Sequence, residues 1–250
     1  MILAKTLDEA RASRHKGVLH NGCVYWRSDF FGSPSGPNEE PQGFLVEQSP
    51  SSVVPPHFHQ EDEFQVVVRG TGRLGRDFLH PLTVHYTNAY TGYGPIYADG
   101  EGLSYFTLRA RHDPGARFLP ESRPLQKMVP RRHLLCGETA SPQEGGLQNL
   151  EGTRLEEVLA PQEDGLAAWK VRMGPGAADS LPDPERSGGR YLVVIDGSLT
   201  HGNTSLPRWS CLFIPSGEAP VNLSAGRQGL DALLLQFPRR RWGLPAEPAN

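Results

Sequence analysis

The chain has 250 residues and a formal net charge of −3, with 28 Gly, 23 Pro and 3 Cys. This length fits one large domain or two small ones and can bury a substantial core. No apolar run approaches the roughly 20 residues that a membrane-spanning helix needs. The near-neutral charge gives no electrostatic footprint for nucleic acid. We therefore expect a protein that binds neither a membrane nor nucleic acid.

The compartment is inferred from the start of the chain and from its cysteines. Residues 1–17 contain no apolar stretch typical of a secretory signal. Cys23, Cys136 and Cys211 are odd in number and widely spaced, without a CxxC pair. This spacing argues against a disulfide framework. Together the two observations predict a cytoplasmic protein.

Helical signals are few, and strand signals follow one another along the chain. A short helix is expected from Thr6 to Arg14, with Thr6 as N-cap and Glu9 three residues later. A helical turn is expected at 155–159. The other apolar runs are short and bounded by Gly, Pro or Asn, and they predict strands at 24–26, 44–46, 64–68, 104–108, 169–173, 191–195, 211–214 and 232–237. Such spacing predicts an all-β sandwich or barrel.

Three sequence blocks recur in the same order at nearly one spacing. The first two recur 127 residues later and the third 125 residues later. The pairs are FQVVVRG (64–70) with YLVVIDG (191–197), LSYFTL (103–108) with LDALLL (230–235), and GYGP (92–95) with GEAP (217–220). The alternative is chance convergence of strand-turn patterns, which does not explain the conserved order. We therefore predict two copies of one β unit.

The first copy contains a cluster of metal-binding residue types, His57, His59 and Glu63, in the sequence HFHQEDE. Residues two apart on a strand point to the same face, and Glu63 has the same parity. Two imidazoles and a carboxylate form a facial ligand set for one divalent transition metal. Three protein ligands leave positions open for water or substrate, as in catalytic sites. The alternative is a solvent-facing histidine pair without metal.

The pattern HxHx3Ex6G, which runs from His57 to Gly70, resembles the first motif of the cupin superfamily. In that family the two His and the Glu bind metal inside a small β-barrel, and the Gly closes the following turn. The leading Gly of the family motif is Ser51 here.

The second family motif, PxGxxH, normally supplies a fourth histidine ligand. In this chain the corresponding stretch places Pro95 at the histidine position. Either the metal has three protein ligands, or a nearby residue completes the site. His80, His85 and Tyr93 are the candidates for that position.

The resemblance covers residues 40–110 and, through the repeat, 167–238. It implies a bicupin, which has two tandem double-stranded β-helix (jelly-roll) barrels in one chain. The expected domains are an N-terminal barrel with the metal site (1–115), a linker and decorating segment (116–165) and a degenerate C-terminal barrel without a metal site (166–250).

The second copy lacks the proposed ligands. A shift of 127 residues leads from them to Pro184, Arg186 and Arg190. The repeat keeps its strands and turns but loses the HxHxxxE residues, so these residues are interpreted as functional and not as requirements of the fold.

Candidate substrate-binding residues follow from strand parity and from the second motif. Gln65 shares the face of Glu63, while Tyr93, Tyr105 and Arg109 lie in or after the second motif. An arginine in such a barrel could bind a carboxylate through two hydrogen bonds. The alternative for Gln65 and Arg109 is an exposed position on a strand.

We therefore hypothesise a metal-dependent bicupin enzyme that acts on a small organic substrate. A non-haem dioxygenase is favoured, with Fe(II) as the metal and Mn, Ni, Cu or Zn as alternatives. The other hypotheses are a cupin isomerase, decarboxylase or lyase, and a non-catalytic small-molecule-binding or sensing cupin. The family resemblance also implies a homodimer.

Overall fold

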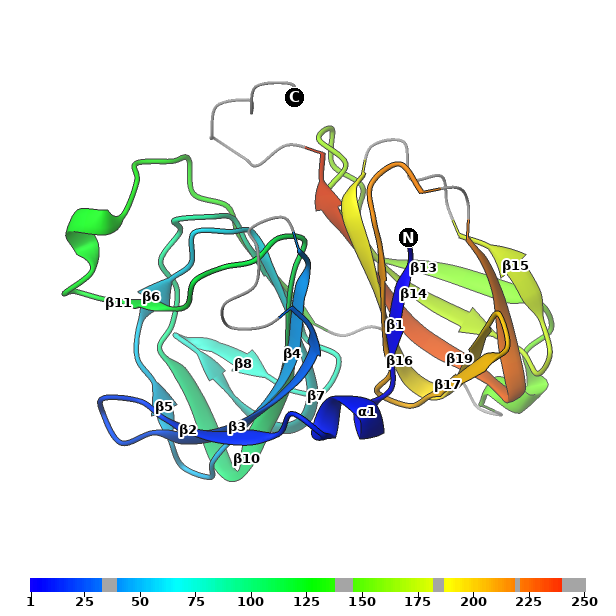
Figure 1. Cartoon of the computed structure of the whole chain (residues 1–250), viewed down its shortest axis with the longest axis horizontal. Helices are drawn as coiled ribbons and strands as arrows, with labels where there is room; N and C mark the ends of the chain where they lie inside the picture. The colour runs from blue at the N-terminus through cyan, green and yellow to red at the C-terminus, as the bar shows by residue number, and fades with distance from the viewer. Residues whose placement is uncertain (33–39, 138–145, 182–186, 219–220, 240–250) are drawn as a thin grey trace. The chain divides into compact units, whose positions relative to one another are not determined.

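The computed structural model describes residues 1–250 except for 33–39, 138–145, 182–186, 219–220 and 240–250 (Figure 1). The chain divides into two compact units. The N-terminal unit comprises Ala10–Gly137, and the C-terminal unit combines Met1–Glu9 with Glu138–Arg239. The regular secondary structure of the described residues is almost entirely antiparallel sheet, which confirms the all-β prediction.

The N-terminal unit is built on a nine-stranded sheet of order β12-β9-β7-β10-β4-β3-β2, with β5 beside β10 and β8 beside β7, and a small sheet of β11 and β6. Its elements are β2 (His15–Val18), β3 (Val24–Phe31), β4 (Gln42–Gln48), β5 (Val53–Val54), β6 (His57–Phe58), β7 (Glu63–Leu74), β8 (Asp77–Leu79), β9 (Val84–Thr87), β10 (Ile96–Arg109), β11 (Arg117–Phe118), the 3-10 helix η1 (Arg123–Leu125) and β12 (His133–Cys136).

The C-terminal unit is built on an eight-stranded sheet of order β1-β18-β16-β19-β14-β13, with β15 beside β19 and β17 beside β16. Its elements are β1 (Leu3–Lys5), η2 (Leu147–Asn149), β13 (Thr153–Leu159), β14 (Ala167–Met173), β15 (Ala178–Ser180), β16 (Ser187–His201), β17 (Thr204–Pro207), β18 (Cys211–Ile214) and β19 (Asn222–Pro238). Helix α1 (Leu7–Arg11) follows β1.

The N-terminal helix forms with the predicted capping box but is shorter than expected. The Thr6 backbone N–H donates to Glu9 Oε2 at 2.8 Å, and the Glu9 N–H donates to Thr6 Oγ1 at 3.2 Å. The helix ends at Arg11 because Ser13 turns the chain, its hydroxyl donating to the Ala10 carbonyl at 2.7 Å.

The expected helical turn at 155–159 is wrong. These residues belong to β13, where Leu155 pairs with Val171. The Leu-Glu-Glu-Val-Leu pattern fits a helical turn locally, but pairing with β14 along the sheet edge decides the outcome. The eight strands predicted from apolar runs are all confirmed.

The two units repeat one strand register. In β7 and β10 Gly70 faces Leu103, and in β16 and β19 Gly197 faces Leu230, so both partners are displaced by 127 residues. Both glycines have positive φ, and a Cβ on either would lie about 2 Å from a backbone carbonyl oxygen, that of Gly102 or Gly229. The duplicated turn therefore requires glycine in both copies.

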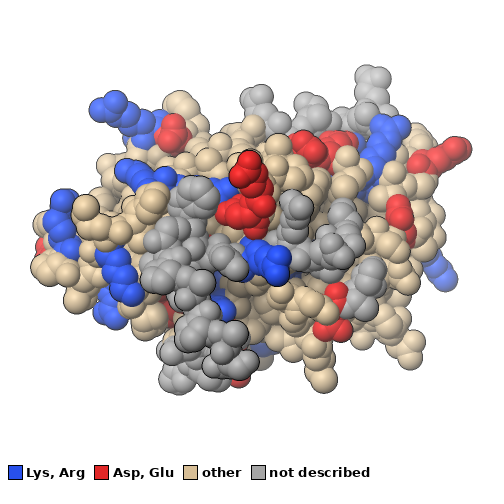
Figure 2. Space-filling view, turned by 90° about the horizontal axis from the view of Figure 1, so that it is seen from above, with Lys and Arg blue, Asp and Glu red and all other residues tan. Residues whose placement is uncertain are grey.

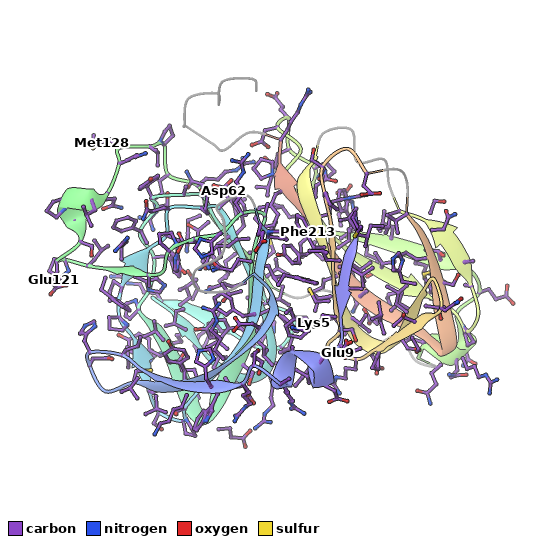
Figure 3. All side chains as sticks on the ribbon, in the orientation of Figure 1. Lys5, Glu9, Asp62, Glu121, Met128 and Phe213 are labelled. Carbon is purple, nitrogen blue, oxygen red and sulfur yellow. The ribbon has the colours of Figure 1, made fainter. Side chains whose placement is uncertain are left out.

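Edge strands extend each unit beyond the boundaries predicted from sequence. β11 pairs with β6 and β12 with β9, so the N-terminal unit continues past residue 115 to Gly137. β13 joins the C-terminal unit, and so does β1, which pairs with β18. Between β11 and β12 the chain runs out from the barrel through η1, and Met128 lies on its outer side (Figure 3).

An apolar cluster lies inside the C-terminal unit, and charged residues of both signs lie on the surface, as the near-neutral composition predicts. The C-terminal unit encloses a wholly apolar core cluster that includes Leu192, Val194 and Leu234. Figure 2 shows Lys and Arg interspersed with Asp and Glu on the face seen from above. The three cysteines are free thiols. None of the described helices is long and apolar enough to cross a membrane.

We expect Gly70→Ala to lower the free energy of unfolding by about 2 kcal/mol or more, because alanine at positive φ is strained and its Cβ meets a carbonyl oxygen. Chemical denaturation followed by circular dichroism measures the change. Gly100→Ala is the matched control, since nothing lies within 4 Å of its Cβ position. Equal stability of the two variants would contradict the argument.

Candidate metal and substrate site

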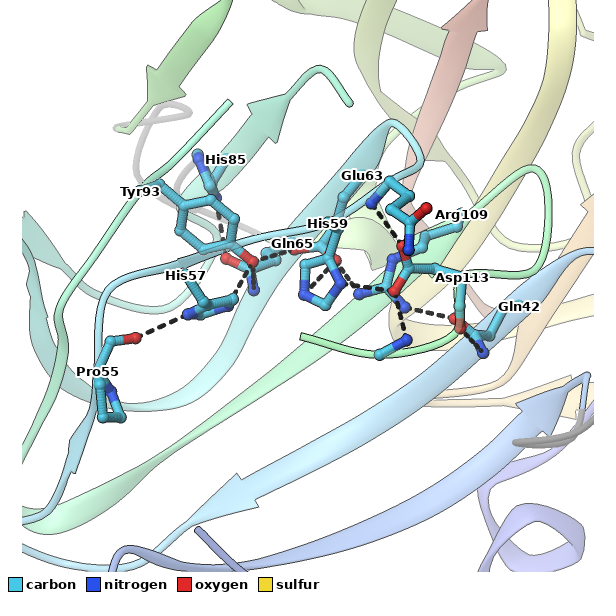
Figure 4. A network of polar contacts seen from close by, with 12 residues as sticks. Gln42, Pro55, His57, His59, Glu63, Gln65, His85, Tyr93, Arg109 and Asp113 are labelled. Carbon is cyan, nitrogen blue, oxygen red and sulfur yellow. Dashed lines mark hydrogen bonds and ion pairs between the residues drawn. The ribbon is translucent and has the colours of Figure 1, made fainter. Parts of the chain in front are cut away.

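The three predicted ligands meet at one end of the N-terminal barrel. His57 lies on β6, and its backbone exchanges hydrogen bonds with Tyr93 at 3.1 and 3.0 Å. His59 follows β6, and Glu63 begins β7. All three side chains are buried, with exposed fractions of 4, 7 and 0%. The pairing of β6 places the His57 imidazole beside the Tyr93 hydroxyl, and His59 lies beside the Glu63 carboxylate (Figure 4).

Both histidines are fixed through the Nδ1 atom. His57 Nδ1 donates to the Pro55 carbonyl at 2.8 Å, and His59 Nδ1 donates to Asp113 Oδ1 at 2.7 Å. The Nε2 lone pairs are thereby left to face the site, which is how metal-ligating histidines are usually oriented. Burial lowers the pKa of His57 to about 4, with a further contribution from His59. His57 is therefore neutral at pH 7.

Asp113 is a site residue that the sequence interpretation did not identify. Besides His59, its carboxylate accepts hydrogen bonds from the backbone N–H groups of Gln60 at 2.7 Å and Gly115 at 2.8 Å. Burial alone would raise the pKa of Asp113, but His59, Arg109 and the backbone N–H of Gln60 hold it well below its usual range. Asp113 is thus an ionised anchor that sets the orientation of His59.

The Glu63 carboxylate has partners on both oxygens. Oε1 accepts a hydrogen bond from the Tyr93 hydroxyl at 2.6 Å, and Oε2 forms an ion pair with Arg109. His59 Nε2 lies 3.7 Å from the same Oε2. Burial favours the protonated form, but the Arg109 guanidinium outweighs it and keeps the pKa of Glu63 below its ordinary value. The carboxylate is therefore buried and charged.

The Arg109 guanidinium is the counter-charge of the Glu63 carboxylate. Its Nη1 donates to Gln42 Oε1 while its Nη2 faces Glu63, and its side chain is 3% exposed. The structure therefore places the guanidinium in an ion pair inside the barrel and not at an exposed strand end. The binding of a substrate carboxylate by Arg109 stays a prediction that competes with this ion pair.

Tyr93 and Gln65 also lie in the site. The Tyr93 hydroxyl lies 2.9 Å from His57 Nε2, and Gln65 Nε2 donates to it at 3.4 Å. Gln65 Oε1 in turn accepts a hydrogen bond from His85 Nδ1 at 2.9 Å. Among the three candidates for a fourth ligand, Tyr93 is thus nearest to His57 and Glu63. His85 lies behind Gln65, and His80 does not line the cavity.

Within the part of the chain that the structure describes, no three His, Cys, Asp or Glu side chains are positioned to hold a metal ion as they stand. The hydrogen bonds account for this, because both Glu63 oxygens are directed to Tyr93 and Arg109. The donor types and the orientations of the imidazoles nevertheless fit a divalent transition metal. Metal binding would require Glu63 to exchange one present partner for the ion.

These residues line a cavity of about 210 Å³ in the N-terminal barrel. Its wall combines the polar site with apolar and aromatic side chains and with Arg27. The lining includes Leu19, Tyr25, Arg27, Gln42, Phe44, Val46, Val54, His57, His59, Glu63, Gln65, Tyr93, Tyr105, Thr107, Arg109, Asp113 and Phe118. Tyr105 therefore also lines the cavity, and its role in substrate binding stays a prediction.

The C-terminal barrel provides an internal comparison for this cavity. Equivalent positions follow from the shared register, since Gln65 pairs with Thr107 in the first unit and Leu192 with Leu234 in the second. By the same register, the C-terminal counterparts of Gln42, Tyr105, Glu63 and Arg109 are Ala167, Ala232, Arg190 and Gln236. Glu63 and Arg109 are thus replaced by other buried polar residues, Arg190 and Gln236, while alanine replaces Gln42 and Tyr105. The counterparts of His57 and His59, Pro184 and Arg186, lie outside the described residues.

Comparison with solved structures identifies the fold. No protein-family model and no curated protein matches the chain. A putative dioxygenase from Nostoc punctiforme has a TM-score of 0.68 at 12% identity, covering 100% of this chain and 88% of that one. Bacterial pirin from Escherichia coli in complex with nickel(II) has a TM-score of 0.57 at 13% identity, covering 95% and 99%.

Bacillus subtilis oxalate decarboxylase has a TM-score of 0.56 at 13% identity, covering 95% of this chain and 77% of that one. These neighbours are cupin-fold proteins. The protein therefore has a cupin fold, and its two units with one repeated register make it a bicupin, as the HxHx3Ex6G resemblance implies. At these identities the likeness defines the fold alone.

We expect Arg109→Gln to destabilise the metal-free protein by about 3–5 kcal/mol, because Glu63 is left buried without its counter-charge. The double variant Glu63→Gln, Arg109→Gln should recover most of this loss. Chemical denaturation of all three proteins in the presence of a chelator measures the coupling.

The matched control is Arg14→Gln, which removes the exposed ion pair with Glu47 and should cost less than about 1 kcal/mol. If the double variant were as unstable as Arg109→Gln alone, the ion pair would not be the source of the stabilisation.

Proposed function

We propose that this protein is a metal-dependent bicupin enzyme that acts on a small organic molecule in its N-terminal barrel. His57, His59 and Glu63 would hold one divalent transition metal. One observation carries the proposal: both imidazoles commit Nδ1 to an acceptor, so His57 Nε2 faces the Tyr93 hydroxyl and His59 Nε2 faces the buried Glu63 carboxylate that the same hydroxyl contacts. A purely structural histidine pair has no need of this arrangement.

The favoured activity is that of a dioxygenase. A 2-His-1-carboxylate set with open positions is typical of non-haem Fe(II) oxygenases. When bound, the metal supplies a Lewis acid and, if redox-active, a centre for electron transfer. Mn, Ni, Cu and Zn are the alternative metals, and isomerase, decarboxylase and lyase reactions are the alternative activities. The nickel(II) complex of pirin and the Mn(II) centres of oxalate decarboxylase support a divalent transition metal.

The surrounding residues have separate roles in this proposal. Asp113 holds the His59 ring and its tautomer, and Arg109 keeps Glu63 ionised. The Tyr93 hydroxyl lies between His57 and Glu63, where it can donate a proton to a bound oxygen atom or hold it by a hydrogen bond.

A second candidate function is the binding of a small molecule without metal or catalysis. The observation that favours it is that Glu63 already has a partner on each oxygen, Tyr93 and Arg109. In that case the cavity would be a ligand-binding or sensing site. Metal content decides between the two functions. A homodimer and a cytoplasmic location stay predictions from the sequence.

We expect purified protein prepared without chelators, and then offered Fe(II), Mn, Ni, Cu or Zn, to hold about one metal ion per chain. The variant His57→Ala, His59→Ala should lose it because two of three ligands are gone. Elemental analysis measures the metal, and circular dichroism verifies the fold. His15→Ala, His201→Ala is the matched control, since neither histidine lines the cavity. Metal-free wild-type protein under these conditions would overturn the proposed function.

The dioxygenase hypothesis predicts oxygen consumption by the Fe(II)-loaded protein with a member of a panel of diketones, catechols and 2-hydroxy acids. An oxygen electrode measures the rate, and the His57→Ala, His59→Ala variant supplies the background. Substrate turnover without oxygen uptake would instead indicate an isomerase, decarboxylase or lyase.

A further inference from the structure

The cavity wall contains a second arginine whose polar contacts are incomplete. Arg27 lies on β3, and its Nε donates to Asp29 Oδ1 at 2.6 Å. Its guanidinium packs over the Phe44 ring, with Cζ 3.6 Å from the ring centroid. Its Nη2 is buried and has no hydrogen-bond partner among the described residues. A buried donor without a partner is costly, so this group calls for an explanation.

Arg27 and Arg109 both line the cavity, but their hydrogen-bond partners differ, and so do the roles available to them. Arg109 is engaged by Glu63 and Gln42 within the barrel. Arg27 has a single carboxylate partner, Asp29, and its side chain keeps 16% exposure at the cavity. Burial lowers the pKa of Arg27 and the neighbouring Arg109 adds to that effect, so an additional anion here would be stabilising. Of the two guanidiniums, that of Arg27 is therefore better placed to receive an anionic ligand.

The internal repeat supports a functional origin for Arg27. Arg27 pairs with Val46, which pairs with Tyr105, and Leu155 stands at the corresponding place beside Val171 and Ala232. The second barrel keeps the strand and replaces the arginine by leucine. The jelly-roll fold therefore does not require a cation at this position.

The rest of the wall limits the shape of the ligand. Beside Arg27 the cavity is lined by Leu19, Tyr25, Phe44, Val54 and Phe118. A volume of about 210 Å³ is small for a ligand pocket. The wall therefore suits a compact apolar or aromatic body with one anionic group. A planar guanidinium recognises a planar carboxylate best.

We propose that Arg27 binds the carboxylate of a small monocarboxylic acid with a compact apolar or aromatic body. The ligand would lie with its other end towards His57, His59 and Glu63. The inference rests on the proposed function, since it names the substrate class of the same site. It assigns to Arg27 the carboxylate-binding role that the sequence suggested for Arg109.

Calorimetric titration with benzoate and with its neutral isostere benzamide tests the proposal. We expect wild-type protein, metal-loaded or metal-free, to bind benzoate about 10-fold or more tightly than benzamide, as expected for a charge-assisted contact. Arg27→Met keeps the packing over Phe44 and should lose this preference. Arg14→Met is the matched control, since Arg14 also pairs with a carboxylate and lies over an aromatic ring, but outside the cavity.

Arg27→Lys is the second variant, for use if Arg27→Met does not fold. It keeps the charge but loses the planar pair of donors, and it should reduce the preference for benzoate at least several-fold. A wild-type protein without the preference, or a folded Arg27 variant that keeps it unchanged, would overturn the proposal. Elemental analysis of the same samples separates the two hypotheses. Metal without a benzoate preference refutes only the role of Arg27, and a benzoate preference in a protein that takes up no metal refutes only the metal site.

Discussion

The N-terminal barrel depends on a carboxylate with no exposed surface, that of Glu63, and on the guanidinium of Arg109 beside it. An ionised carboxylate in such a place is stable only when its charge and its hydrogen bonds are satisfied. The contacts that do so extend through the site. Arg109 fixes Gln42, whose amide donates to the Asp113 carbonyl at 3.3 Å, and Asp113 in turn orients His59. One ion pair thus links the position of the carboxylate to that of an imidazole on another strand.

Comparison of the two copies shows whether the fold itself requires this network. The C-terminal barrel keeps the paired strands and the positive-φ glycines, but Arg190 stands where the first barrel has Glu63, and Gln236 where it has Arg109. It encloses an apolar cluster and buries other charged side chains, among them Lys170 and Arg190. A jelly roll of this register therefore forms without the His57, His59, Glu63 and Arg109 set, so the fold does not require these residues.

The sequence patterns predicted those features of the fold and the site that depend on residues close together in the sequence. The HxHxxxE spacing predicted one cluster of His57, His59 and Glu63, whose side chains are all buried, and the repeat located the turns that need Gly70 and Gly197. Asp113 and Arg27 were missed because their roles arise from contacts across the barrel, 54 residues apart in the case of His59 and Asp113. No local pattern encodes such a contact. The edge strands were missed for the same reason, since β1 finds its partner in β18 near the other end of the chain.

The charges around the cavity connect the metal and the substrate. The carboxylates of Glu63, Asp113 and Asp29 lie near the guanidiniums of Arg27 and Arg109. A divalent ion held by His57, His59 and Glu63 would add positive charge to the site, and one carboxylate would offset part of it. The site would therefore bind a monocarboxylate more tightly once the metal is in place, although the guanidinium of Arg27 alone selects the carboxylate over its neutral isostere. This order of binding would place the acid between a fixed cation on the wall and the open positions of the metal, where the substrate has to lie for reaction.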